Sequence, residues 1–140
     1  MHKTRDFGLL LLRLGIGSMF VYHGWGKFFG GPPVWKSVGG AMGFVGISFV
    51  PTFWGFMAAF SEFIGGILMI LGLGFQAALT LMFITMAVAT TMHLSKGDGL
   101  LVASHAIENG IVFFSLIFIG PGRLSLDEKF KSGCCCHKEK

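Results

Sequence analysis

The stretch Leu9–Lys27, LLLLRLGIGSMFVYHGWGK, decides the fold, because it is apolar enough to cross a bilayer and yet carries Arg13, His23 and Lys27. A hydrocarbon core about 30 Å thick needs about 20 helical residues. At about 100° per residue, Lys27 and His23 lie about 40° and about 80° around the helix from Arg13, on one narrow arc. Ionisable side chains inside a span usually face a bundle interior. The stretch therefore predicts one wall of a membrane bundle with a polar seam.

The composition of the whole chain also indicates a membrane protein. Its 140 residues are 53% hydrophobic and 13% charged, whereas soluble domains carry about 25% charged residues. The mean hydropathy is +0.72. The apolar run is too long for a signal peptide and has no small-x-small site before Lys27, so we expect a permanent helix. The net charge of +4 is modest, and we expect no nucleic-acid partner.

Glycine and proline clusters divide the chain into an all-α, integral membrane four-helix bundle. The predicted spans are residues 7–29, 52–72, 75–93 and 100–119. Residues 34–48 are too short to span, and they predict a short interfacial or re-entrant helix between the first two spans. We expect a transmembrane domain at residues 1–126 and a mobile, polar cytoplasmic tail at residues 127–140.

The distribution of Lys and Arg predicts that both termini are cytoplasmic, which is the N-in/C-in arrangement. Four spans place both ends of the chain on one side of the lipid bilayer. Seven basic residues flank that side and three flank the other: Lys3, Arg5, Arg123, Lys129, Lys131, Lys138 and Lys140 against Lys27, Lys36 and Lys96.

Titratable side chains from all four spans fall at similar depths in the outer half of the membrane. Counted at 1.5 Å per residue, the histidines of the first and fourth spans lie about 8–9 Å deep, and the two glutamates about 12–15 Å deep. On the fourth span, i, i+3, i+4 spacing places three polar residues on one face. The set is His23, Glu62, His93, His105 and Glu108, with Asn109 beside them.

Two of the three interpretations of this seam need no redox chemistry. Buried His and Glu can hydrogen-bond across helices, each adding about 1 kcal/mol or less, while Arg13 snorkels toward the headgroups. Alternatively, the seam binds a transition metal, because three His and two Glu are ligands for Zn, Fe, Cu or Mn. The metal signal is weak, since H-x-x-E is not an established zinc motif. The candidate metal ligands are His23, His93, His105, Glu62 and Glu108.

The third interpretation is a quinone or proton-linked redox site. An apolar slot with a His and a carboxylate can bind a quinone head and exchange protons with it. Aromatic side chains for stacking are available at Phe20, Tyr22, Trp25, Phe53 and Trp54, although Trp and Tyr at span ends commonly form an interfacial belt.

The three cysteines Cys134–Cys136 are consecutive and followed by His137, so they do not form an ordinary disulfide framework. They predict either a free tail, palmitoylated near the membrane, or a metal-handling tail. Adjacent cysteines do not easily wrap one tetrahedral ion.

Five segments together resemble the DoxX family of small four-helix membrane proteins, over about residues 9–127. They are RLGIGSMFVYHGWGK (Arg13–Lys27), AAFSEFIGGILMILGL (Ala58–Leu73), His93, Ser104-x-x-x-Glu108 and GPGRLSLD (Gly120–Asp127). The resemblance implies a multi-pass protein of the bacterial inner membrane. Family members are linked to quinone-coupled sulfur oxidation, to membrane oxidoreductase complexes and to maturation of other proteins. The family pattern maps onto Arg13, His23, Lys27, Glu62, His93 and Glu108, whereas His105 and the cysteine tail are features of this member.

We therefore expect a membrane redox component that works with a quinone or with a membrane or periplasmic oxidoreductase partner. In this hypothesis Glu62 and Glu108 handle protons, and Arg13 and Lys27 balance these carboxylates. The ligand contacts come from His23, His105, His93 and Asn109.

The alternative is a non-enzymatic binding or assembly protein that holds a metal ion or a partner segment. The G-x-x-x-G pair Gly39 and Gly43 favours either a homo-oligomer or close packing within one chain.

Overall fold

The computed structural model describes residues 2–135, with side-chain burial for residues 4–130. The described residues form helices and turns and no strand, which confirms the all-α class. Four helices are long and apolar enough to span a membrane, namely α1 (over Thr4–Phe28), α3, α4 and α5. In chain order the elements are α1 (His2–Phe28), α2 (Gly31–Gly39), the 3₁₀ helix η1 (Gly40–Val45), α3 (Pro51–Leu71), α4 (Phe75–Lys96), α5 (Leu100–Ile119) and α6 (Leu126–Cys135).

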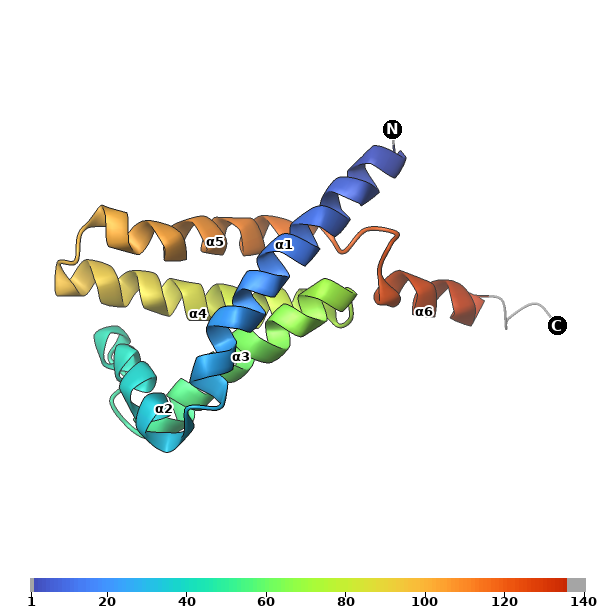
Figure 1. Ribbon diagram of the computed structural model, residues 1–140. Helices are drawn as coiled ribbons and strands as arrows, with labels where there is room; N and C mark the ends of the chain where they lie inside the picture. Colours follow the sequence, from blue (N-terminus) through green and yellow to red (C-terminus); the bar gives the residue numbers. More distant parts are fainter. Residues whose placement is uncertain (1, 136–140) are drawn as a thin grey trace.

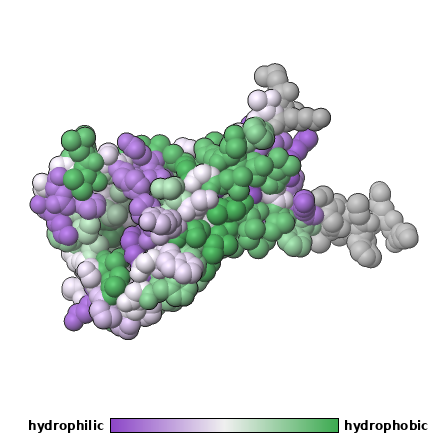
Figure 2. Space-filling view, viewed as in Figure 1, coloured by the Kyte–Doolittle hydropathy of each residue, from purple (hydrophilic) through white to green (hydrophobic). Residues whose placement is uncertain are grey.

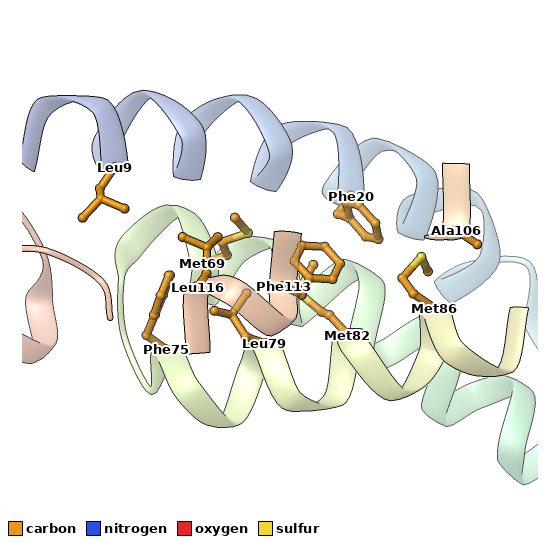
Figure 3. Close-up of a cluster of buried hydrophobic side chains, with 10 residues drawn as sticks. All are labelled: Leu9, Phe20, Met69, Phe75, Leu79, Met82, Met86, Ala106, Phe113 and Leu116. Carbon is orange, nitrogen blue, oxygen red and sulfur yellow. The ribbon is translucent and has the colours of Figure 1, made fainter. Parts of the chain in front are cut away.

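Each long helix packs on the next one along the chain: α1 on α3, α3 on α4, and α4 on α5 (Figure 1). The α4–α5 turn, α2 and η1 lie at one end, called here the α2 end, and the N-terminus and α6 lie at the other, the terminal end. Helices α1 and α5 meet through side chains, including the Phe20 and Phe113 rings, whose centroids are 4.9 Å apart. Side chains from α1, α3, α4 and α5 point toward one another in an apolar core (Figure 3). The core comprises Leu9, Phe20, Met69, Phe75, Leu79, Met82, Met86, Ala106, Phe113 and Leu116.

Arg13 lies in the terminal half, where its side chain joins α1 to two other parts of the chain. It is 1% exposed. Its Nε and Nη2 donate to the carbonyls of Met69 and Ile70, at 3.0 and 2.8 Å. Its Nη1 donates to the carbonyls of Pro121 and Leu124, at 3.0 and 2.9 Å. The last carbonyls of a helix lack intrahelical partners and carry partial negative charge, so a guanidinium is well suited to cap α3.

This placement corrects the expected role of Arg13 in two respects. The guanidinium does not snorkel to the headgroups, because it is buried and donates four of its five N–H groups to carbonyls inside the protein. It also does not balance the seam carboxylates, because its partners lie at the C-terminal end of α3 and in the α5–α6 connection.

The tail that was expected to be mobile from Asp127 begins instead with α6. The Asp127 carboxylate accepts hydrogen bonds from the Gly74 and Phe75 N–H groups at 3.0 Å each, where the positive end of α4 favours an anion. The Asp127 N–H donates to the Gly72 carbonyl at 3.0 Å. The expected boundary at residues 126 and 127 therefore falls inside a helix fastened to the bundle. Cys136 and His137 lie outside the described residues.

Helix α2 packs against the start of α3 through two glycines. A Cβ on Gly39 would overlap the backbone of Pro51, and a Cβ on Gly55 would overlap the backbone of Trp35. Only hydrogen side chains permit this approach. Gly39 therefore serves packing within one chain, while Gly43 has no neighbour within 4 Å of its Cβ position.

Candidate functional site

A pocket of about 210 Å³ lies at the α2 end, beyond the apolar core. Helices α1, α3, α4 and α5 all contribute to it. Its apolar residues are Phe20, Met86, Ala89, Val102 and Ala106, and its polar residues are His23, Lys27, Glu62, His93 and His105. Figure 2 shows hydrophilic residues gathered on the half of this face toward the α2 end, while hydrophobic residues cover most of the half toward the terminal end.

Lys27 and Glu62 form an ion pair in this pocket. The Lys27 ammonium lies 2.8 Å from Oε1 and 2.7 Å from Oε2 of Glu62. The Glu62 side chain is 5% exposed and that of Lys27 is 37% exposed. A Cβ on Gly24 would lie 2.5 Å from the Phe63 nitrogen, so a glycine lets α1 approach α3 closely here. The Trp35 Nε1 donates to the Lys27 carbonyl at 2.9 Å and ties α2 to the end of α1.

Two histidines face each other where α1 and α5 meet. The ring centroids of His23 and His105 are 5.7 Å apart, with an interplanar angle of 65°. Both residues are exposed, although both also line the pocket. Their imidazoles form its mouth, where each ring nitrogen can donate or accept a hydrogen bond according to tautomer.

His93 lies at the pocket wall nearest the α4–α5 turn. Its Nδ1 is 2.8 Å from Oδ2 of Asp98. Asp98 was not predicted as a site residue, because it lies between the predicted third and fourth spans, outside both. The signal was the Gly97-Asp98 pair after a long apolar helix, because a glycine just past a helix end folds the following residue back over the last turn.

Two predicted site residues on α5 do not join the pocket. Glu108 is exposed on the outside of the bundle, and Asn109 donates from Nδ2 to the carbonyl of His105 at 2.7 Å. Small residues Ala103, Ala106 and Gly110 are buried, and this packed face of α5 leaves Glu108 on the opposite side. The i, i+3 spacing predicts that Glu108 and His105 are neighbours on the surface of α5. It does not predict which side of α5 packs against the other helices.

The candidate metal ligands do not assemble into a metal site. Among the residues that the structure describes, no group of three His, Cys, Asp or Glu is placed to hold an ion. Glu62 is engaged by Lys27, His93 is engaged by Asp98, and Glu108 faces outward. The arrangement instead presents hydrogen-bonding groups above an apolar floor.

Of the aromatic residues expected to stack on a ligand, Phe20 lines the pocket. Tyr22 and Trp25 are exposed, as expected of a membrane interface belt. Phe53 and Trp54 contact each other at the start of α3, with ring centroids 5.3 Å apart.

The comparisons with known proteins agree with this fold. Residues 8–94 match the family model described as DoxX, a shorter stretch than the expected residues 9–127. A Haemophilus influenzae protein with the name "Uncharacterized protein" is 32% identical over 138 residues, which cover 93% of this chain and 96% of that protein. A Bacillus subtilis protein with the name "Putative oxidoreductase CatD" is 36% identical over 73 residues, covering 52% of this chain and 49% of that protein. No solved structure matches the chain significantly.

Proposed function

The chain belongs to the DoxX family of membrane proteins, and on this premise we propose that it is a membrane redox component that binds a quinone head in the Lys27–Glu62 pocket. One observation carries the proposal: an ion pair with a buried carboxylate and two histidines line one pocket with apolar walls between four helices. The oxidoreductase name of the Bacillus subtilis relative supports a redox role.

The pocket residues fit the chemistry of a quinone head. Such a head is a flat apolar ring with two carbonyl acceptors, and ligand sites of this kind combine apolar walls with few polar groups. Phe20, Met86 and Ala106 supply the walls, and the histidines at the mouth supply N–H donors. The volume of about 210 Å³ suits a single ring and is below the range of about 300–1,000 Å³ typical of drug-sized ligands.

Each polar residue has a role that follows from its position. The Lys27 ammonium donates toward a carbonyl oxygen of the ring while Glu62 holds it in place. Glu62 accepts or releases a proton, because it is the buried carboxylate of the pocket. A bound quinone would supply the capacity to take up two electrons and two protons. The electrons come from a membrane or periplasmic oxidoreductase in this proposal, and the protein lies in the bacterial inner membrane with both termini in the cytoplasm.

The direct test is binding of a decyl-tailed benzoquinone to the purified protein in detergent. We expect wild-type protein to bind it, and His23→Ala and His105→Ala to raise Kd at least about tenfold each, since one lost hydrogen bond costs about 1.4 kcal/mol. Asn109→Ala is the matched control, because Asn109 was expected in the site but bonds its own helix. A wild-type protein that binds no quinone would contradict the proposal.

A second candidate function is assembly with another membrane helix, and Glu108 favours it. This residue lies about 12 Å along α5 from its α2 end, is exposed, and has no hydrogen bond or ion pair to any described residue. A carboxylate at such a depth costs about 2.5–3.5 kcal/mol on insertion scales when it faces lipid. A partner helix with a donor at that depth, from a second copy or an oxidoreductase subunit, removes this cost.

Replacing Glu108 with leucine is therefore expected to abolish assembly and to leave quinone binding intact. The measurement is cross-linking in the native membrane followed by the mass of the products. Ser115→Leu serves as the control, because Ser115 is also exposed on α5 but satisfies its hydroxyl on its own backbone. If wild type and Glu108→Leu give the same products, α5 is not an assembly surface.

A further inference from the structure

We infer that Asp98 and His93 form a proton path between the water at the α2 end and the Lys27–Glu62 pair, an inference that rests on the proposed function. The path has two ends in different surroundings. Asp98 lies in the α4–α5 turn, where its side chain is 37% exposed, and His93 lines the pocket. The 2.8 Å contact between His93 Nδ1 and Asp98 Oδ2 joins the two ends.

The backbone at the end of α4 builds this contact. Gly97 has φ of 75°, the left-handed conformation that glycine adopts most readily. Its N–H donates to the Leu94 carbonyl at 3.2 Å, and the Asp98 N–H donates to the His93 carbonyl at 3.2 Å. These two bonds define the Schellman cap, which places the residue after the glycine over the residue five positions earlier. An apolar contact frequently accompanies this cap, but here the pair is an aspartate on a histidine.

The hydrogen bond to Asp98 also selects the form of the His93 ring. A carboxylate only accepts, so Nδ1 carries the proton and Nε2 keeps its lone pair for the pocket. When Nε2 takes a proton from the pocket, Nδ1 can release one to Asp98 and thence to water, which leaves one proton moved and the ring neutral. The same sequence runs in reverse for uptake.

Titratable groups from the three other long helices share the pocket with His93. Lys27 and His23 come from α1, Glu62 from α3 and His105 from α5, and all of them line the same pocket. On the turn side the neighbouring cation Lys96 lies over the Phe44 ring, 5.7 Å from its centroid. Asp98 accepts the hydrogen bond from His93 and is partly exposed. It therefore acts as a positioning residue as well as the entry to water.

The experiment has two arms. In the first, ¹⁵N-histidine NMR of the full chain in detergent reports the tautomer of His93, assigned with His93→Gln. We expect an Nδ1–H tautomer in the wild type and a mixture in Asp98→Asn.

In the second arm, dithionite supplies two electrons and water two protons to a bound decyl-tailed benzoquinone. We expect Asp98→Asn to slow hydroquinone formation at least about tenfold, to change its pH profile, and to leave Kd unchanged.

The controls separate this inference from the proposed function. Asp98→Glu should restore most of the rate, and Ser95→Ala, in the last turn of α4, should leave it unchanged. Wild-type protein that binds no quinone defeats the proposed function and this path with it. Quinone binding with an Nε2–H tautomer of His93, or with equal rates and pH profiles in wild type and Asp98→Asn, overturns the path alone.

Discussion

Replacing Arg13 with lysine is expected to lower the melting temperature of the protein in detergent by at least about 10 °C. The wild-type guanidinium is 1% exposed and makes four hydrogen bonds to backbone carbonyls of two segments, the end of α3 and the α5–α6 connection. Lysine keeps the charge but has one ammonium with three donors, and it lacks the planar fork of five N–H groups. Lysine at position 13 therefore cannot satisfy all the carbonyls that Arg13 binds. Its compact ammonium charge is also poorly solvated at this buried site.

The magnitude follows from the hydrogen bonds that are lost. Bonds with a charged partner contribute about 1.5–3 kcal/mol each, and a buried group left unsatisfied costs a further 1–3 kcal/mol, by order of magnitude. Losing two of the four bonds thus costs about 5 kcal/mol, which is comparable to the whole stability of a small domain at about 5–15 kcal/mol. Because Arg13 holds the end of α3 and the α5–α6 connection, both segments should loosen together.

Thermal unfolding monitored by circular dichroism, with Arg5→Lys as the matched control, measures this effect. Arg5 lies on the same helix, its side chain is 61% exposed, and its nearest carboxylate, Asp6, is 3.8 Å away. Exposed substitutions of this kind change stability by about 0.5 kcal/mol or less. Equal melting temperatures for wild type and Arg13→Lys would contradict the capping role.

The long helices could be predicted from the sequence because two strong signals agree. Apolar runs of membrane length predict spans, and glycine or proline clusters predict where they end. The predicted fourth span, residues 100–119, coincides with α5, and the short helix before α3 is present as α2. The tail was harder, since its polar composition is typical of disorder, and nothing in composition shows that Asp127 caps α4.

The site could be predicted in part, because depth follows from chain position but direction around a helix does not. Depth grouped His23, Glu62, His93 and His105, and the structure brings these four together. Depth also included Glu108, which faces away because the small residues on α5 decide which face packs. Arg13 and Lys27 lie on the same arc of α1 but near opposite ends of that helix. They therefore meet different partners, the end of α3 for Arg13 and Glu62 for Lys27.

Exchanging both members of the Lys27–Glu62 pair for neutral residues is expected to spare the fold and abolish quinone binding. The two single substitutions should differ in their effects on stability. Lys27→Met leaves Glu62, with a side chain 5% exposed, without its partner, and breaking a buried pair in this way costs about 3–5 kcal/mol. Glu62→Gln costs less, because the Lys27 side chain is 37% exposed and can turn toward the pocket mouth.

In the double variant Lys27→Met/Glu62→Gln neither charge is left alone, so its stability should return to within about 1 kcal/mol of the wild type. Melting temperatures of the four proteins give the coupling energy, and binding of decyl-tailed benzoquinone gives the function. Glu108→Gln is the control for removing a carboxylate from a span, and it should retain binding because Glu108 faces away from the pocket. If the double variant is stable and still binds quinone with wild-type Kd, the ion pair holds α1 to α3 and takes no part in ligand recognition.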